Sequence, residues 1–486
     1  MILTVDIGTS SIKVALVDLG GRVLKEVARP VELHMPEFGA AEHDLEAIFR
    51  GVTEAIGNVV KGFERNIYAI SFGCYLHGIA LLSSEMKPAT NIFTHLDTRP
   101  GVHQDEIAQY GLELYSRTGC PPIFVYPIVK LKWLKAIGLL EKARFISFVK
   151  DYVLYKLTGV WVLDYGTASG TGLMNIHSLK WDPLALSVVE IDEKKLPELV
   201  EGSKVIDYRT LPELGLERVA IVPGSFDGGL QNVGYGVYGD EGVLNMGSTA
   251  VVRVLRRDIV LDKSPEMRFF CYYTADGYKA IGAASNNGMV FLEWVRENLL
   301  GASKWDNVVE LIKNVPPCSE DVYVMPFITG ERFPFRDPYL KLTILGIKMN
   351  HGVNHLVKAS IEGVGYTLRA SLDAMGESGV YVKNLHCGGG GCNLVEAIKI
   401  ISSITGKPIY VYDNRVARMA STIGAAIVAM RALGHVNDIA KAHSEVVLGA
   451  RVHYIAPEKP DQVAYERCYK KFLVYVKELV KLYRLQ

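Results

Sequence analysis

The chain has 486 residues, which is longer than the chains that usually fold around a single hydrophobic core, so we expect two large lobes. Hydrophobic residues make up 49% of it and charged residues 22%. The 53 Lys and Arg residues balance 53 Asp and Glu residues, so the net charge gives no reason to expect nucleic acid or an anionic membrane as a partner. The chain shows no basic leader and no apolar run of about 18 residues, the length that a helix needs to cross a bilayer, so we expect a cytoplasmic protein.

The first elements form a meander followed by a helix and a buried strand. The stretch VDIGTSSIKVALVD, residues 5–18, predicts strands over 2–7 and 12–18 that are joined at GTSS, and a third strand follows over 23–33. Apolar residues at helical spacing predict a helix over 45–63. The run IYAISFGCY, residues 67–75, is typical of a buried strand. The first lobe is therefore predicted to mix antiparallel strands with βα units.

Residues 243–254, VLNMGSTAVVRV, repeat the pattern of this opening hairpin. When Asn245 is aligned with Asp6, Gly247 falls on Gly8 and two hydroxyl residues follow in both copies. The second copy lies near the middle of the chain, so each half is expected to open with the same hairpin. Two similar lobes with facing hairpins would bind a ligand in the cleft between them.

The second half continues as an alternation of strands and helices. Residues 277–298 predict a strand, a glycine turn and a helix, and residues 353–375 predict a long helix. Residues 384–406 read as a strand, a glycine loop and a helix, and residues 408–413 as a strand. The small residues of 420–433 suit a closely packed helix, and the apolar face of 463–483 predicts a helix docked on the body.

The seven cysteines are scattered along the chain and show neither a disulfide framework nor the spacing of a zinc site. Cys387 and Cys392 bracket GGGG, and this spacing suits no common metal knuckle. We therefore predict small buried thiols at all seven positions, Cys74, Cys120, Cys271, Cys318, Cys387, Cys392 and Cys468.

The DIGTSS hairpin has the residue types that bind nucleotide phosphates with Mg²⁺. Its glycine allows close backbone approach, and the Thr and Ser residues offer N–H and O–H donors. The carboxylate of Asp6 could hold Mg²⁺ through water. The alternative is an ordinary hairpin turn with a solvated Asp.

Two further segments carry candidate groups. Asp227, in VPGSFDGGLQNVGYG, follows an apolar strand and precedes two glycines, so a ligand could approach its carboxylate; the alternative is an Asx turn or a helix N-cap. The segment CGGGGCNLVEAI, residues 387–398, could cradle a nucleotide before a helix that begins near Asn393. A dinucleotide-binding loop fits it poorly, because the spacing differs from GxGxxG, and a tight turn remains an alternative.

Polar residues after two apolar runs could bind a polyol. His77 lies in CYLHG, and Asp97 and Arg99 lie in HLDTRP. The alternatives are a core histidine and a surface ion pair.

Together these segments resemble the FGGY carbohydrate kinases, within the actin-like ATPase superfamily, almost from end to end. YPIVKLKWL, residues 126–134, fits the first signature of that family, with a Lys three residues before a Trp, and LGIKMNHGVNHLVKASIEG, residues 345–363, fits the second. DIGTSS, FDGG, MGSTA, GERFPF and GGGGCN follow in the family's order. The resemblance implies an α/β fold of two ribonuclease-H-like lobes, 1–240 and 241–486, with ATP and Mg²⁺ in the cleft between them.

The resemblance also implies a role for each matching residue. Asp227 falls on the catalytic base, and Asp6 on the acid that holds Mg²⁺, usually through water. The sugar-contacting pair is His77 and Gly78, to which we add Asp97 and Arg99 as candidate substrate ligands. The positions that match the ATP site are Thr9, Ser10, Ser11 and Lys13 in the first phosphate loop, Gly247, Ser248 and Thr249 in the second, and Gly389, Gly390 and Asn393 near the nucleoside.

Further segments narrow the choice of sugar substrate without deciding it. Residues 269–294 are similar to the gluconokinase branch, whereas LHG at 76–78 is closer to xylulokinases, and Val125 stands where glycerol kinases place a substrate tyrosine. We expect ATP-dependent phosphorylation of a small sugar or sugar acid, D-gluconate first, with Arg99 as a candidate cation for its carboxylate. A pentulose such as xylulose or ribulose, and a non-catalytic actin-like nucleotide-binding module, are the alternatives. The expected partner is the small sugar, and we expect neither nucleic acid nor a membrane as a partner. A homodimer is a candidate for the assembly of the chain.

Overall fold

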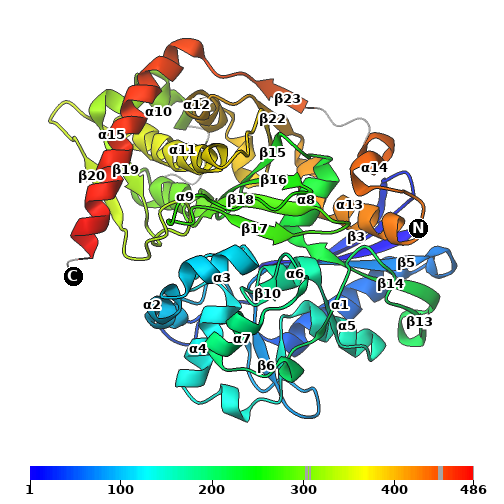
Figure 1. Ribbon diagram of the computed structural model, residues 1–486. Helices are drawn as coiled ribbons and strands as arrows, with labels where there is room; N and C mark the ends of the chain where they lie inside the picture. The colour runs from blue at the N-terminus through cyan, green and yellow to red at the C-terminus, as the bar shows by residue number, and fades with distance from the viewer. Residues whose placement is uncertain (302–304, 306–307, 447–451, 485–486) are drawn as a thin grey trace.

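The computed structural model describes residues 1–301, 305, 308–446 and 452–484. Two β-sheets form its centre, with helices packed around them, and elements of the first half of the chain fill most of the lower part of Figure 1. In spatial order, the first sheet contains β13 (Asp207–Leu211), β14 (Leu216–Phe226), β5 (Ala69–Cys74), β1 (Ile2–Ile7), β2 (Ser11–Val17) and β3 (Val23–Pro30). The second contains β17 (Phe270–Tyr273), β18 (Lys279–Ser285), β16 (Ala250–Arg256), β15 (Glu241–Met246), β21 (Asn384–Gly388), β22 (Ile409–Tyr412) and β23 (Val452–Ile455).

The two sheets repeat one strand order. In the first, β1, β2 and β3 pair antiparallel, and β5 and β14 continue the sheet in parallel beyond β1. In the second, β15, β16 and β18 pair antiparallel, and β21 and β22 continue in parallel beyond β15. The hairpins β1–β2 and β15–β16 therefore occupy equivalent places. This repeat confirms the expected α/β architecture of two similar lobes.

The residues of the central strands explain their positions. Both β1 and β5 are buried along their whole length, as expected for strands covered on both faces. The last strand of the meander, β3, alternates between half-buried and exposed residues, which suits a sheet edge. Helix α1 (Leu45–Val60) begins where the Asp44 carboxylate accepts a hydrogen bond from the Ala47 N–H at 2.9 Å, and it buries one apolar face.

The other helices cover these sheets or build the outer parts of the molecule. The longer ones are α11 (Val353–Glu377), α12 (Val395–Thr405), α13 (Asn414–Ala432) and α15 (Lys459–Tyr483). The shorter ones are α2 (Gln104–Ala108), α3 (Gly111–Thr118), α4 (Pro127–Ala136), α5 (Lys150–Thr158), α6 (Tyr165–Ser169), α7 (Pro183–Val189), α8 (Asp227–Tyr235), α9 (Met289–Asn298), α10 (Val308–Lys313) and α14 (Ile439–Val446). Among the described helices, none combines the length and the apolar character needed to cross a bilayer.

Short strand pairs stabilise the peripheral segments. They are β4 (Glu42–His43) with β7 (Ile92–Phe93), β6 (Ala80–Leu82) with β8 (Phe145–Ser147), β9 (Val162–Asp164) with β12 (Glu198–Val200), β10 (Met174–Asn175) with β11 (Lys180–Trp181), and β19 (Tyr323–Pro326) with β20 (Leu342–Leu345).

Helix α13 belongs to the second half of the sequence but packs on the first sheet. It contacts β1, β5 and β14 and lies along α8, and Figure 1 draws it beside β3. The two helices approach closely through glycines: a Cβ on Gly234 would lie 1.8 Å from the Ala420 carbonyl oxygen, and one on Gly424 would lie 1.9 Å from that of Leu230. The small residues of α13 are therefore explained by this backbone contact.

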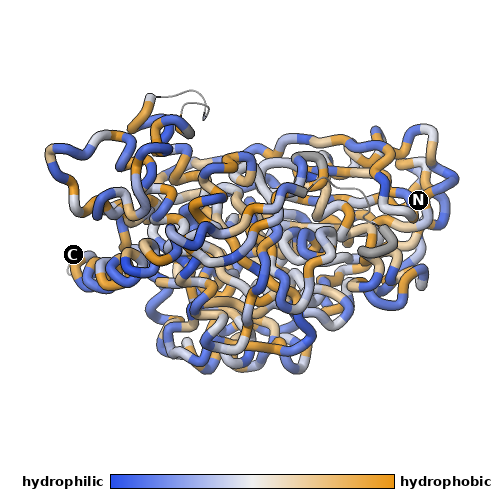
Figure 2. The backbone as a smooth tube through the Cα atoms, turned by 90° about the horizontal axis from the view of Figure 1, so that it is seen from above, coloured by the Kyte–Doolittle hydropathy of each residue, from blue (hydrophilic) through white to orange (hydrophobic). Residues whose placement is uncertain are grey.

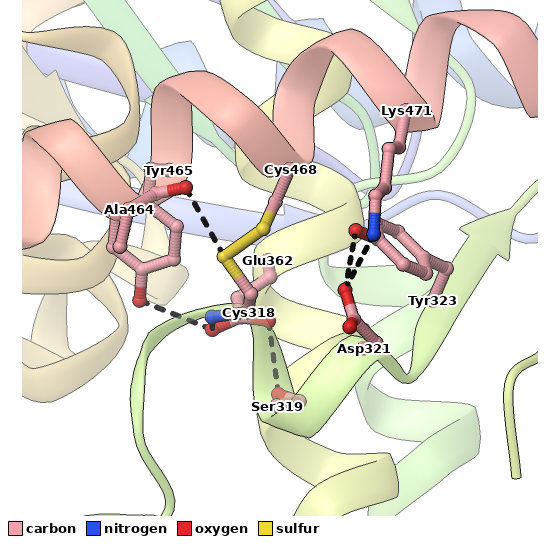
Figure 3. The surroundings of a disulfide bond; sticks show 9 residues. All are labelled: Cys318, Ser319, Asp321, Tyr323, Glu362, Ala464, Tyr465, Cys468 and Lys471. Carbon is pink, nitrogen blue, oxygen red and sulfur yellow. Dashed lines mark hydrogen bonds and ion pairs between the residues drawn. A yellow bond between two sulfur atoms is a disulfide. The ribbon is translucent and has the colours of Figure 1, made fainter.

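The C-terminal helix α15 is docked on the body, as predicted. Figure 2 shows hydrophobic and hydrophilic residues alternating along it, and its buried residues are Tyr465, Cys468, Tyr469, Phe472, Val476 and Leu479. A disulfide joins Cys468 to Cys318, and Figure 3 shows the Glu362 carboxylate beside it. That carboxylate accepts hydrogen bonds from the Cys318 N–H at 3.0 Å, the Ser319 hydroxyl at 2.9 Å and the Tyr465 hydroxyl at 3.1 Å.

The prediction of seven thiols is wrong for four cysteines. Cys318 and Cys468 are 150 residues apart and meet only because α15 packs against the turn that contains Cys318. Cys387 and Cys392 form a second disulfide across the glycine loop. Spacing along the chain cannot reveal the first pair, because tertiary packing creates it. Cys74, Cys120 and Cys271 are buried free thiols, as predicted.

Candidate functional site

A cavity of about 450 Å³ is lined by residues of both halves of the chain. Both hairpins reach it, together with the start of α8 and polar residues from β16, β17 and the segment that follows β5. Its lining includes most of the residues singled out in the sequence, namely Asp6, Thr9, Ser10, Ser11, Lys13, His77, Asp227, Gly247, Ser248, Thr249 and Gly389.

Asp6 lies at the end of β1, paired with Lys13 on β2 and with Gly73 on β5. One carboxylate oxygen, Oδ2, accepts a hydrogen bond from the Ser421 hydroxyl of α13 at 2.6 Å. The other, Oδ1, is buried and has no hydrogen-bond partner among the described residues. An unpartnered carboxylate oxygen at the edge of the cavity fits the oxygen donors that Mg²⁺ prefers, directly or through water.

Asp227 is the first residue of α8, immediately after β14. The residue at the N-cap position is Phe226, so Asp227 is not the N-cap; its Oδ1 accepts the N–H of Gly228 at 2.6 Å. Burial and the charge of Asp6 raise the pKa of the Asp227 carboxyl to about 6, against the opposing effect of Arg253. A carboxylate that titrates close to neutral pH suits a general base.

A buried ion pair holds the strand end that precedes Asp227. The Lys150 ammonium contacts the Asp164 carboxylate at 2.5 Å and donates a hydrogen bond to the Ser225 carbonyl at 2.9 Å, and both charged side chains are fully buried. Sequence reasoning missed this pair, because its members become neighbours only through folding.

The second hairpin separates the cavity from a neighbouring one of about 610 Å³. Gly247 and Ser248 line both, and their carbonyls accept hydrogen bonds from Met289 and Val290 at the start of α9. The second cavity is also lined by Met246, Met289, Glu293, Trp305, Gly390, Gly391, Asn393 and Leu394. The hairpin is thus held where it can face phosphates on one side and a nucleoside on the other.

The glycine loop fits a bound nucleotide because it carries no bulk. Gly389 has φ of 93°, and a Cβ there would lie 2.7 Å from the Met246 carbonyl oxygen and 2.9 Å from Asn245 Oδ1. The Cys387–Cys392 disulfide closes the loop at its base. Gly390 and Asn393 face the second cavity, where the nucleoside was predicted.

The other end of the first cavity is lined by His77 and His95 and by Tyr126 and Tyr272, whose hydroxyls are hydrogen-bonded to each other. His77 Nδ1 bonds the Gly170 carbonyl at 2.8 Å, so Nδ1 carries the proton. Burial lowers the pKa of His77 well below its usual value, so the ring is neutral and Nε2 is an acceptor. Such an acceptor suits a sugar hydroxyl.

Lys130, the lysine of the YPIVKLKWL segment, supports this end of the cavity. Its buried ammonium donates hydrogen bonds to the carbonyls of His77 and Thr94, each at 2.6 Å, and of Phe93 at 3.1 Å. His77 has φ of 72°, which is uncommon for a residue with a side chain. The three hydrogen bonds therefore fix a strained segment beside the cavity.

Three residues predicted to contact substrate do not line the cavity. Gly78 is packed against Tyr75, Val149 and Ile92. Asp97 is fully buried, and the Arg99 guanidinium contacts Asp97 and Glu42 at 2.5 Å each and Glu37 at 2.7 Å. The charge of Arg99 is thus already neutralised by three carboxylates.

Arg332 lines the cavity instead, and sequence reasoning did not single it out. It is 7% exposed, and its buried Nε has no hydrogen-bond partner among the described residues. The adjacent Glu331 carboxylate is occupied by the Ser285 hydroxyl at 2.6 Å and the Asn286 N–H at 3.0 Å. The GERFPF motif contains Arg332 and could have drawn attention to it. Whether the side chain points into the cavity, however, depends on the fold.

Comparisons with known proteins agree with this geometry. The N-terminal and C-terminal domain models of the FGGY family of carbohydrate kinases match residues 1–234 and 243–433. A gluconokinase of Bacillus subtilis is 29% identical over 390 residues, 75% of each chain, and a xylulose kinase of the same organism is 22% identical over 98% of this chain and 97% of its own.

Solved structures show the same likeness over the whole chain. Gluconate kinase and ligand-bound xylulose kinase, both from Lactobacillus acidophilus, each superpose with a TM-score of 0.92 and 25% identity and cover 99% of this chain and 98% and 99% of their own. The family models match well over half of the residues. The chain therefore belongs to the FGGY family of carbohydrate kinases, and it is a sugar kinase that uses ATP with Mg²⁺.

Proposed function

We propose that this kinase phosphorylates a hydroxyl of a sugar acid, D-gluconate, with Asp227 as general base. The observation that carries the proposal is Arg332, a buried cation that lines the sugar end of the cavity and has no ion pair among the described residues. A buried guanidinium without a counter-ion is costly, and a substrate carboxylate would supply one. The similarity to gluconokinases supports the same choice.

In this proposal each part of the site has a task in phosphoryl transfer. Asp227 accepts the proton of the attacking hydroxyl, and the hairpin groups of Thr9, Ser10, Ser11, Lys13, Gly247, Ser248 and Thr249 hold the phosphates. Gly389, Gly390 and Asn393 receive the nucleoside. Asp6 would hold Mg²⁺ through water, and the ion would supply charge neutralisation on the phosphates. His77 orients the sugar through Nε2, and Lys130 fixes the His77 backbone.

A pentulose such as xylulose or ribulose is the second candidate. Xylulose kinases match this chain over almost its whole length, which favours it, whereas a neutral pentulose would leave the charge of Arg332 unpaired. A non-catalytic nucleotide-binding module would have no use for a base with the raised pKa of Asp227.

For Gly78, Asp97 and Arg99 we now propose a supporting role, because they lie behind the cavity wall.

A coupled ATP-to-ADP assay over D-gluconate, D-xylulose, D- and L-ribulose and glycerol tests the proposal, with Asp227→Asn as the blank. We expect the highest kcat/KM with gluconate. Arg332→Met should raise KM for gluconate by about 10²-fold or more, because a charge-assisted pair of hydrogen bonds to the carboxylate is lost. The same change should have little effect on the turnover of a neutral sugar. Arg336→Met, which changes a half-buried arginine of the same segment outside the cavity, is the control. A neutral sugar preferred over gluconate would overturn the sugar-acid assignment.

We further propose that the protein works in the cytoplasm, where ATP and Mg²⁺ are supplied, and that it forms a homodimer. The monomer has a mass of 53.7 kDa. Sedimentation velocity at micromolar concentration should give twice this mass, and a single species of the monomer mass would contradict the dimer.

A further inference from the structure

A second buried arginine lies close to the proposed base. Arg253, on β16, lines the first cavity and is 6% exposed. Its Nε donates to Asn232 Oδ1 at 3.1 Å and its Nη2 to Gln231 Oε1 at 2.7 Å. Both acceptors are neutral amides on α8, and Arg253 forms no ion pair within the described part of the chain. The guanidinium is therefore held in place by neutral hydrogen-bond partners, close enough to the Asp227 carboxylate for the two charges to interact.

Two glycines make the room that this side chain occupies. A Cβ on Gly282, the neighbour of Arg253 on β18, would lie 2.8 Å from its Cγ. A Cβ on Gly228, the residue after Asp227, would lie 2.8 Å from its Nη1. The stem of Arg253 thus runs past Gly282, and its guanidinium ends against the backbone next to Asp227.

We propose that Arg253 is a further catalytic residue whose guanidinium binds the phosphoryl group while it passes from ATP to the sugar. In that step the sugar hydroxyl oxygen forms a bond to the γ-phosphorus, and the bond from this phosphorus to the bridging oxygen breaks. The electron pair of that bond leaves with ADP, and the hydroxyl proton goes to Asp227. Negative charge spreads over the transferred oxygens, where a fixed cation stabilises it. The inference rests on the proposed role of Asp227.

The position of Arg253 distinguishes the phosphoryl group from a substrate carboxylate as its ligand. Asp227 marks the place where the reacting hydroxyl must lie. The group that this hydroxyl attacks is the phosphoryl group, so the guanidinium beside Asp227 is placed for that group. Arg332 instead neighbours Tyr126 and Tyr272 at the sugar end of the cavity. The two buried guanidinium groups are thus suited to two separate anionic groups of one reacting complex.

The test uses the full-length protein with Arg253→Gln and Arg253→Lys, and Arg336→Met as the control outside the cavity. Folding is checked by melting temperature and by binding of MgADP. We expect kcat of Arg253→Gln to fall by about 10²- to 10⁴-fold with KM for sugar changed less than about threefold. Arg253→Lys keeps the charge and should lose less, so it also serves if the Gln variant fails to fold.

Calorimetry supplies a readout that does not depend on turnover. In the parent protein, aluminium fluoride with MgADP and the sugar should bind more tightly than MgADP alone, because it mimics the transferring phosphoryl group. In Arg253→Gln this gain should disappear while binding of MgADP alone stays within about twofold. An unchanged gain would overturn the inference.

A pH profile separates this role from an indirect one. If Arg253 only kept Asp227 ionised, the variant would regain the parent's kcat at high pH, with its acidic limb moved upward, and the inference would be wrong. We expect the loss to persist at every pH. Asp227→Asn distinguishes the two proposals: if it retains turnover, the proposed function fails whatever Arg253 does.

Discussion

Asp227 should set the pH dependence of the reaction. Burial and the neighbouring Asp6 raise the pKa of its carboxyl to about 6. A general base acts only when it is ionised, so kcat/KM should fall about tenfold per pH unit below about pH 6 and level off above it. Steady-state rates between about pH 5 and pH 8, with the fold followed by circular dichroism, measure this limb. Asp227→Asn should lack it, and a flat profile in the parent protein would argue against Asp227 as the base.

At the scale of residues, the sequence predicts groups that a local motif marks. Asp6 lies near the end of the buried strand β1, Asp227 directly follows β14, and a glycine comes within two residues of each; the structure brings both to one cavity. Arg253 and Arg332 also lie in quoted motifs, but whether they point into a cavity depends on strand register and on distant glycines such as Gly282. Arg99 shows the reverse case: its motif predicts a substrate ligand, but its guanidinium contacts carboxylates from segments up to 62 residues away, which the motif does not show.

At the scale of elements, the contact between α8 and α13 should tolerate no added bulk. Gly424→Ala would place a Cβ 1.9 Å from the Leu230 carbonyl oxygen, so the two helices would have to separate. We expect the free energy of unfolding to fall by at least about 2 kcal/mol in urea titrations. Gly57→Ala in α1, where a Cβ would meet nothing within 4 Å, is the matched control and should be neutral or slightly stabilising. Equal effects of the two changes would contradict this account.

The two disulfides should contribute unequally to stability. Cys318–Cys468 closes a loop of 150 residues, whereas Cys387–Cys392 closes one of five. The chain-entropy model gives roughly 5 kcal/mol for the first and roughly 2 kcal/mol for the second. Replacing each pair by serines and measuring unfolding in urea should therefore show the larger loss for the Cys318 and Cys468 pair. A larger loss for the other pair would mean that the glycine loop, rather than α15, limits stability.

The elements themselves were largely predictable, and their long-range partners were not. The strands of the opening meander and the helices over 45–63, 353–375 and 463–483 follow from apolar periodicity and lie within a few residues of β1, β2, β3, α1, α11 and α15. The small residues of 420–433 indicated close packing, but no local pattern says which sheet α13 covers. That choice depends on the glycines of α8, which lie almost 200 positions earlier in the chain.

At the scale of the whole molecule, α13 bears on the lobe boundary predicted at residue 240, because this helix of the second half packs on the sheet of the first. Its Ser421 hydroxyl binds Asp6, and its backbone packs on α8, so a fragment of residues 1–240 would lack the helix that covers one face of its sheet. We expect that fragment alone to show no cooperative thermal transition, because the apolar residues of α8 and β5 would be exposed. Co-expression with residues 241–486 should restore a folded complex that binds MgADP. The full chain is the reference for both the melting curve and the binding measurement. A fragment 1–240 that unfolds cooperatively by itself would show that the first lobe does not need α13.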